Sequence, residues 1–244
     1  MAQVMENHPM DKHTVVSRES WIKARKRLLA KEKEFTRLRD ELSRQRRRLP
    51  WVRVGKAYAF DGPNGGETLA ELFAGRSQLI VYHFMFDPEW ETGCKSCSFW
   101  ADNFNGIVVH LSQRDVSFVA ISRAPLEKLQ TFARRMGWSF KWLSSFGNDF
   151  NRDYGVSFAP EDLAAGQVTY NYAAQKSSTS ELPGVSVFFR DSAGDVYHTY
   201  SCDARGLDIL NGAYHFLDLT PKGRDEAGLP HTMSWVRLRD QYGA

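Results

Sequence analysis

The sequence predicts an α/β fold, in which a central mixed β-sheet is flanked by helices and preceded by a long N-terminal helix. Residues 79–86 and 116–122 have the length and apolar composition of buried strands. A segment typical of a helix follows each of them, so the two strands should be joined by a crossover and lie parallel. Two further β-prone stretches flank a turn at residues 191–195, which indicates an antiparallel hairpin.

Residues 1–50 are expected to form a separate basic segment. The first 13 residues are polar and are predicted to be disordered. A long amphipathic helix should run from about Val15 to Leu49 and end at Pro50. This segment carries a net charge of +7, whereas the rest of the chain carries −4. Large apolar residues recur in it every seven positions, at Trp21, Leu28, Phe35, Leu42 and Leu49.

The heptad-spaced row has two explanations that the sequence leaves open. The helix packs along its own domain, or it pairs with a second copy in a homodimer. The basic charge also allows contact with nucleic acid. Charge runs on helices are usually solvated faces, so a nucleic-acid partner is not expected.

Residues 51–244 are expected to form one domain with a loop insertion. It should begin with a turn at 61–66 and a short helical turn at 67–73. Two strand–helix units follow: the strand at 79–86 with a helix from Cys97 toward Asn105, and the strand at 116–122 with a helix from Pro125 to Met136. After them we expect an irregular aromatic stretch at 138–158 that contributes to the core, a surface loop at 159–182, the hairpin and a final helix around 209–217.

Composition excludes several classes of protein. The chain has 244 residues and 3 cysteines, too few for a scaffold built from disulfides. No apolar run reaches the length needed to span a membrane, and residues 1–20 lack the apolar region of a signal peptide. We therefore expect a cytoplasmic protein without a membrane partner.

The motif with chemical potential is Cys94-Lys95-Ser96-Cys97, which lies where a strand gives way to a helix. Two intervening residues allow both sulfurs to meet on the first helical turn, within disulfide reach. Unpaired N–H groups at the helix start, together with the charge of Lys95, should favour a thiolate at Cys94. The thiolate is the nucleophilic form of cysteine, so the motif predicts thiol–disulfide chemistry.

The alternatives for the pair are a metal site and an unreactive structural pair. Zinc needs four ligands, and only Cys202 remains among the cysteines. We expect neither a metal nor an organic cofactor, and we expect Cys202 to be a buried thiol without a redox role.

Several stretches resemble the DUF899 family of thioredoxin-like proteins, which are described as predicted dithiol–disulfide oxidoreductases. The matching stretches are FMFDPEWETGCKSCSFWADNFNG, ISRAPLEKLQTFARRMGW, SSFGNDFNRDYGVSF, GVSVFFRD and ARGLDILNGAYHFLDLTPKGR. More distantly, residues 58–200 look like the AhpC/TSA and thioredoxin group. The resemblance implies a thioredoxin-like fold in which Cys94 attacks and Cys97 resolves the mixed disulfide.

Three further residues could support the pair, and two of them lie where the chain departs from the thioredoxin pattern. His83, in the strand before the motif, is expected to be a hydrogen-bonded core histidine; the alternative is that it accepts the proton of Cys97, as a buried acid does in thioredoxins. Ser186 falls where thioredoxins place the proline that faces their cysteines, while Pro183 lies earlier in the chain. Trp90, in the loop before Cys94, could form a wall of the site or belong to the core.

The leading hypothesis is therefore an enzyme, a thiol–disulfide oxidoreductase. Its partners would be a disulfide or an oxidised thiol as substrate and an external thiol as reductant. The alternatives are a thiol peroxidase, in which Cys94 is oxidised to a sulfenic acid, and a non-enzymatic redox-sensing module whose N-terminal helix binds a partner.

Overall fold

A computed structural model describes residues 13–243 of the chain. It divides into two units, Met1–Pro50 and Trp51–Ala244. The disorder expected for the start of the chain falls, except for residue 13, outside the described residues. The unit that contains the cysteine pair is the second one.

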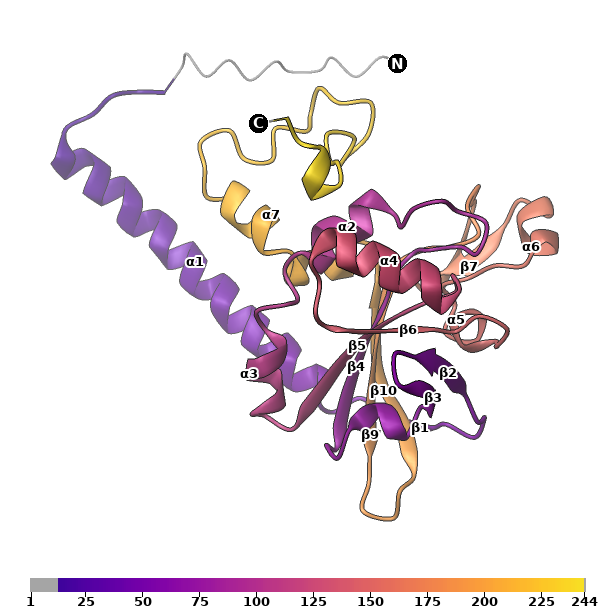
Figure 1. Cartoon of the computed structure of the whole chain (residues 1–244). Coiled ribbons are helices and arrows are strands. Elements are labelled where there is room, and N and C mark those ends of the chain that lie inside the picture. The colour runs from indigo at the N-terminus through magenta and orange to yellow at the C-terminus, as the bar shows by residue number, and fades with distance from the viewer. Residues whose placement is uncertain (1–12, 244) are drawn as a thin grey trace. The chain divides into compact units, whose positions relative to one another are not determined.

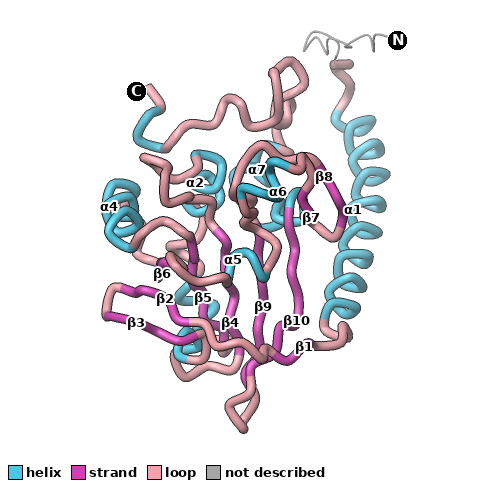
Figure 2. Tube along the Cα trace, turned by 90° about the vertical axis from the view of Figure 1, so that its right-hand side faces the viewer, coloured by secondary structure: helices cyan, strands magenta, loops and turns pink. Residues whose placement is uncertain are grey.

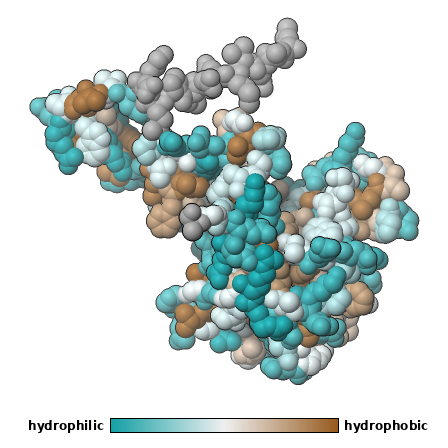
Figure 3. Space-filling model, turned by 45° about the horizontal axis from the view of Figure 1, so that its top comes forward, coloured by the Kyte–Doolittle hydropathy of each residue, from teal (hydrophilic) through white to brown (hydrophobic). Residues whose placement is uncertain are grey.

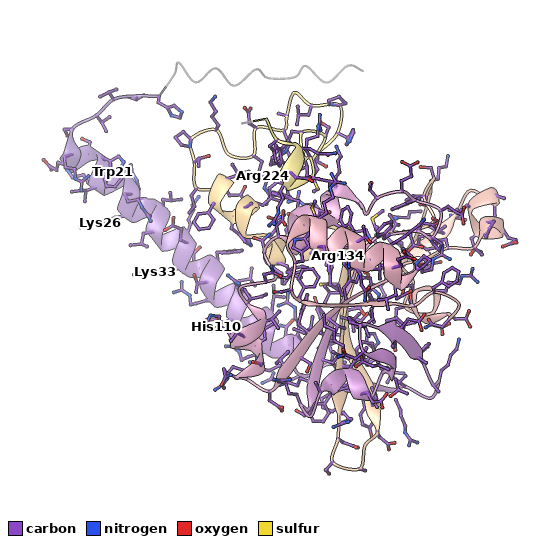
Figure 4. All side chains as sticks on the ribbon, in the orientation of Figure 1. Trp21, Lys26, Lys33, His110, Arg134 and Arg224 are labelled. Atoms are coloured by element: carbon purple, nitrogen blue, oxygen red, sulfur yellow. The ribbon has the colours of Figure 1, made fainter. Side chains whose placement is uncertain are left out.

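The first unit is dominated by one long helix, α1 (Arg18–Arg46). Ser17 caps it, because its hydroxyl accepts a hydrogen bond from the Ser20 amide at 3.2 Å. Figure 4 labels Trp21, Lys26 and Lys33 along this helix. The heptad-spaced apolar side chains of this helix are exposed. Whether they pack on their own domain or on a second copy of the chain stays a prediction.

The second unit is built on a sheet in the order β1-β10-β9-β4-β5-β6-β2-β3, which Figure 2 shows side by side. A separate small sheet pairs β7 with β8. The strands are β1 (Val52–Arg53), β2 (Ala59–Gly62), β3 (Gly65–Thr68), β4 (Gln78–His83), β5 (Val116–Ser122), β6 (Lys141–Ser144), β7 (Val168–Tyr170), β8 (Ala173–Gln175), β9 (Gly184–Arg190) and β10 (Val196–Asp203).

The strand pairing agrees with the predicted crossover and hairpin. β4 is parallel to β5, with Tyr82 opposite Ala120, and antiparallel to β9. β9 and β10 form the antiparallel hairpin. A parallel β-α-β unit whose first strand also pairs with a following antiparallel hairpin is the thioredoxin-like arrangement, so the fold is a thioredoxin-like α/β fold with a long N-terminal helix.

Helices cover both faces of the sheet (Figure 1). α2 and α4 contribute to the core on one face, whereas η2 and α5 contribute to the core on the other. The helices are α2 (Lys95–Ala101), α3 (Val108–Ser112), α4 (Leu126–Met136), α5 (Phe150–Asp153), α6 (Pro160–Ala164) and α7 (Gly212–Leu217), with 3-10 turns η2 (Glu71–Phe73), η3 (Ala204–Leu210) and η4 (Arg239–Gln241).

Two segments differ from the sequence expectation. The aromatic stretch 138–158 was expected to be irregular, but it contains β6, which pairs in parallel with β5. Residues 159–182 were expected to form a surface loop, but they contain α6 and the β7–β8 pair. This segment folds because Val168 and Tyr170 are buried against Val156 and Phe158 in a small separate core.

No helix in the described part of the chain combines the length and apolarity needed to cross a membrane. The surface seen in Figure 3 is largely hydrophilic, with hydrophobic residues scattered among hydrophilic ones.

Candidate redox site at the start of α2

The loop from β4 to α2 places the cysteine pair at the start of the helix. The Cys94 amide donates to the Met85 carbonyl at 3.1 Å, which ties the loop to the end of β4. Gly93 is packed so closely that a Cβ there would lie 2.8 Å from Phe84 and 3.0 Å from Phe132. The position directly before Cys94 therefore requires glycine for steric reasons.

The two sulfurs of the pair are neighbours with different surroundings. Cys94 caps the N-terminus of α2 and is half-buried, whereas Cys97 is buried on the inner face of the helix. A hydrogen bond from the Cys97 thiol is the main influence on the pKa of the Cys94 sulfur. Sulfurs that interact in this way can take part in the exchange reactions of a redox pair.

The pKa of the Cys94 thiol is lowered to about 7. The main cause is the hydrogen bond from Cys97, which outweighs the opposing effect of burial. The backbone N–H groups of Cys97 and Ser96 and the Ser96 hydroxyl lower the pKa further. These unpaired donors of the first helical turn favour the thiolate.

The effect of the Lys95 charge on Cys94 stays a prediction. Its ammonium group donates to the Ser234 carbonyl at 3.4 Å and is not among the main causes of the lowered pKa of Cys94. The neighbouring Ser96 supplies a hydroxyl and an amide to Cys94 instead. The sequence could have indicated this role of Ser96, because Ser96 lies between the cysteines as Lys95 does.

Burial raises the pKa of the Cys97 thiol well above its usual value, and the neighbouring Cys94 raises it further. The Met85 amide and the Tyr82 hydroxyl act in the opposite direction. Cys97 is therefore a protonated thiol while Cys94 carries a charge. The two cysteines are chemically distinct although only two residues separate them.

Tyr82 is a site residue that sequence reasoning missed. Its side chain is 1% exposed and belongs to the same buried cluster as Cys97. Burial, and then the charges of the cysteines, raises the pKa of its hydroxyl, which stays protonated. The hydroxyl influences Cys97 but makes no hydrogen bond of ordinary geometry within the described residues.

His83 lies on the opposite face of the sheet from the cysteines, contrary to the hypothesis that it accepts the Cys97 proton. Its ring contacts Phe150 and Tyr154, and its Nε2 shares a hydrogen bond of 2.9 Å with the Ser186 hydroxyl. Burial, and then the charge of His198, lowers the pKa of His83 to about 3. The alternative that we considered, a hydrogen-bonded core histidine, describes its surroundings.

Ser186 shares this location and therefore does not face the sulfurs. Its hydroxyl lies 3.0 Å from that of Ser201 as well as beside His83. Pro183, which directly precedes β9, lines the same cavity as Cys97. Pro183, three positions before Ser186, is thus the residue at the start of β9 that shares a cavity with Cys97.

Trp90 and Cys202 both belong to the packed core on the α2 face of the sheet. Trp90 is partly buried against the core on the α2 face and does not line the cavity beside Cys97. Cys202 is buried in the same core, on β10. Within residues 13–243, no cluster of three or more histidine, cysteine or acidic side chains is arranged to hold a metal ion.

A cavity of about 500 Å³ opens beside Cys97. Tyr82 and Trp100 form part of its wall, and the Trp100 indole N–H donates to the Leu207 carbonyl at 2.8 Å. The segment after α7 closes the opposite side and includes Arg224, which Figure 4 labels. A space of this volume accommodates a small organic molecule.

Comparisons with solved structures found peroxiredoxin-type proteins. The peroxidoxin BcpB from Mycobacterium tuberculosis is 14% identical with a TM-score of 0.45, over 66% of this chain and 93% of its own. A cysteine-to-serine mutant of Xanthomonas campestris peroxiredoxin Q is 12% identical with a TM-score of 0.42, over 65% and 90%. A yeast mitochondrial 1-Cys peroxiredoxin is 14% identical with a TM-score of 0.41, over 64% and 70%.

No curated protein sequence matches the chain. A family of sequences described as bacterial protein of unknown function matches residues 10–242. This match covers both the helical unit and the unit with the cysteine pair, and it agrees with the resemblance noted from the sequence. The chain belongs to the DUF899 family.

Proposed function

We propose that the protein is a dithiol–disulfide oxidoreductase in which Cys94 attacks and Cys97 resolves. The observation that carries this proposal is the contrast within the pair. The pKa of Cys94 is lowered to about 7, while its hydrogen-bonded neighbour Cys97 is held as a thiol. A nucleophile that is ionised near neutral pH, with a protonated thiol beside it, is the arrangement that two-step disulfide exchange needs.

The reaction proceeds in two balanced steps. The Cys94 thiolate attacks one sulfur of a substrate disulfide, forms a mixed disulfide and expels the other substrate sulfur as a thiolate. Cys97 then attacks the Cys94 sulfur, which releases the second substrate sulfur and leaves a Cys94–Cys97 disulfide, and the proton of Cys97 passes to a released substrate thiolate. The substrate has gained two electrons, and an external thiol reductant returns them to the pair.

The surroundings of Cys97 support this order of events. Besides burial, the causes of its raised pKa are its hydrogen bond to Cys94 and the charge on Cys94. Both disappear once Cys94 is bonded to the substrate. The Met85 amide and the Tyr82 hydroxyl, which favour the Cys97 thiolate, remain. Formation of the mixed disulfide therefore lowers the pKa of Cys97 and activates the second step.

Thiol alkylation and mass spectrometry across a graded glutathione buffer test the proposal. We expect a reversible Cys94–Cys97 disulfide, whose midpoint distinguishes a reductant from an oxidant. The variant Cys97→Ala should accumulate a mixed disulfide on Cys94, and Cys94→Ala should form none. A pair that never becomes a disulfide, even with excess oxidant, would refute the mechanism.

The two alternative functions use the same pair and are separated by other measurements. In a thiol peroxidase, Cys94 would reduce a peroxide to an alcohol or water, and Cys97 would condense with the sulfenic acid and release water. Peroxide consumption at a rate above that of a free thiol would favour this function. A redox sensor would change oligomeric state or partner binding on oxidation, without turnover.

A further inference from the structure

The cavity beside Cys97 has an interior that suits an apolar aromatic group. Its wall includes Tyr82, Trp100 and Tyr214, together with the flexible side chains of Met85 and Met233. Aromatic walls favour flat rings through offset or edge-to-face packing, and methionine adapts to irregular shapes. The Tyr82 hydroxyl supplies a polar group that has no ordinary hydrogen-bond partner among the described residues.

The charged groups of the wall are already paired with one another. The Arg224 guanidinium lies 3.1 Å from Asp208 and 2.9 Å from Asp218, and Arg205 lies 2.9 Å from Asp208. Glu226 accepts hydrogen bonds from other protein groups, including the Tyr214 hydroxyl at 2.8 Å. Of the two arginines of this wall, Arg224 is held by two carboxylates, and the largely exposed Arg205 is bonded to Asp208. A carboxylate that enters the interior of the cavity therefore meets, among the described residues, no cation that is free of an acidic partner.

Lys95, which lies between the two cysteines, does not line the cavity. Its ammonium group is directed to the Ser234 carbonyl. Anionic disulfides such as oxidised glutathione therefore have to compete with Asp208 and Asp218 for the two arginines of the cavity wall.

The backbone around the cavity does not favour an extended peptide. β9 is paired on both sides, with β4 and β10, so a substrate strand has no free edge there. The Tyr170 hydroxyl donates to the Pro183 carbonyl at 2.6 Å and accepts from the Ala204 amide at 2.9 Å. Both backbone groups at this corner of the cavity are thus occupied by a side chain, which favours a small molecule over a protein substrate.

We propose that the cavity binds one half of a small, neutral aromatic disulfide and presents its S–S bond to the Cys94–Cys97 pair. This inference rests on the proposed function and specifies its substrate class. The aromatic group would lie against Tyr82 and Trp100, and its sulfur would be the one that Cys94 attacks. After attack by Cys94, that sulfur becomes the leaving thiolate of the second step, and electrons and protons balance as described above.

The first experiment measures binding without chemistry. Dipyridyl sulfide, a neutral thioether that no thiol can reduce, is titrated into the reduced full-length protein by calorimetry. The dicarboxylate thiobis(benzoate) serves as the anionic counterpart. We expect saturable binding of the neutral probe that is about tenfold tighter or more, equivalent to about 1.4 kcal/mol. Equal affinities, or no saturable binding of the neutral probe, would overturn the inference and leave the redox proposal standing.

The second experiment measures the reaction in a single turnover. Neutral dithiodipyridine and anionic dithiobis(nitrobenzoate) are each reacted with the reduced protein and, as a reference, with N-acetylcysteine. The protein should prefer the neutral disulfide about tenfold more than the reference thiol does. Faster relative reduction of insulin, a disulfide-bonded protein, would overturn the inference in favour of a protein substrate. Failure of the pair to form a disulfide, with binding intact, would refute the proposed function instead.

Two variants locate the effect in the cavity. Thr232→Trp adds bulk to the wall and should weaken binding of dipyridyl sulfide about tenfold, whereas Thr131→Trp, on the exposed side of α4, should not.

Asp218→Asn frees part of Arg224 and should raise the relative rate with the anionic disulfide. Asp240→Asn removes an equivalent exposed partner from Arg135 outside the cavity and should not change that rate. Equal effects in variant and control would contradict the inference.

Discussion

Removing the Cys97 thiol should raise the pKa of Cys94, because the hydrogen bond from Cys97 is the main cause of its low value. A hydrogen bond to a charged group contributes about 1.5–3 kcal/mol, which corresponds to about 1–2 pKa units. In Cys97→Ala the pKa of Cys94 should therefore rise from about 7 to between about 8 and 9.

The consequence is a slower reaction at neutral pH. The thiolate is the form present above the pKa, so the fraction of reactive Cys94 at pH 7 should fall from about one half to between about one tenth and one hundredth. The rate of alkylation at Cys94 should fall about fivefold to fiftyfold. Above about pH 10 the variant and the wild type should react at similar rates, because both are then ionised.

The assay is iodoacetamide modification of Cys94 as a function of pH, followed by peptide mass spectrometry. Cys97→Ser retains a hydroxyl donor and should give an intermediate midpoint. Cys202→Ala removes a buried thiol elsewhere in the same core and should leave the midpoint near 7. A midpoint that stays near 7 in Cys97→Ala would refute the assignment of Cys97 as the group that activates Cys94.

Three further predictions concern the framework around the site. Gly93→Ala places a Cβ 2.8 Å from a phenylalanine ring, so it should destabilise the fold by about 1–3 kcal/mol and slow the alkylation of Cys94. Gly106→Ala, with open space around it, should change neither quantity. Urea unfolding and the alkylation assay measure both variants. Arg123→Met leaves the buried carboxylates of Asp87 and Glu181 without their cation and should lower the free energy of unfolding by about 3 kcal/mol or more. Arg53→Met breaks an exposed pair with Asp195 and should lower that free energy by less than about 1 kcal/mol. If the N-terminal helix pairs with a second copy, Leu28→Glu should convert a dimer to a monomer in sedimentation experiments; an unchanged mass would exclude that use of the heptad row.

The main elements of the fold could be predicted because their signals are local. β4 and β5 are apolar runs of strand length, and the hairpin of β9 and β10 has a polar turn between β-prone stretches. The cysteine pair was placed correctly at the junction of β4 and α2 because the strand before it and the helix after it were both recognisable. No partner from elsewhere in the chain was needed to read these features.

The segment between α5 and β9 could not be predicted for the opposite reason. Its composition is polar, and its two short strands are held by a few apolar residues. Tyr170 is one of them. It is buried and holds the segment in place through hydrogen bonds to Pro183 and Ala204, which are distant in the sequence. A polar stretch with a single well-placed tyrosine has no periodic signal that distinguishes it from a loop.

The candidates His83 and Ser186 do not reach the cysteines for one shared reason, the face of β4. Successive side chains of a strand point to opposite faces, so only one of Tyr82 and His83 can face α2. We considered the histidine as a proton acceptor, beside the core histidine that we expected, because its usual pKa suits proton transfer. The structure directs Tyr82 to the cysteines and His83 to the other core. Ser186 bonds to His83 and lies on that same face, so the choice that misplaced the histidine also misplaced the serine. An apolar strand buried on both faces has no polar alternation to settle this choice, which is why the sequence located the cysteines but not the side chains that face them.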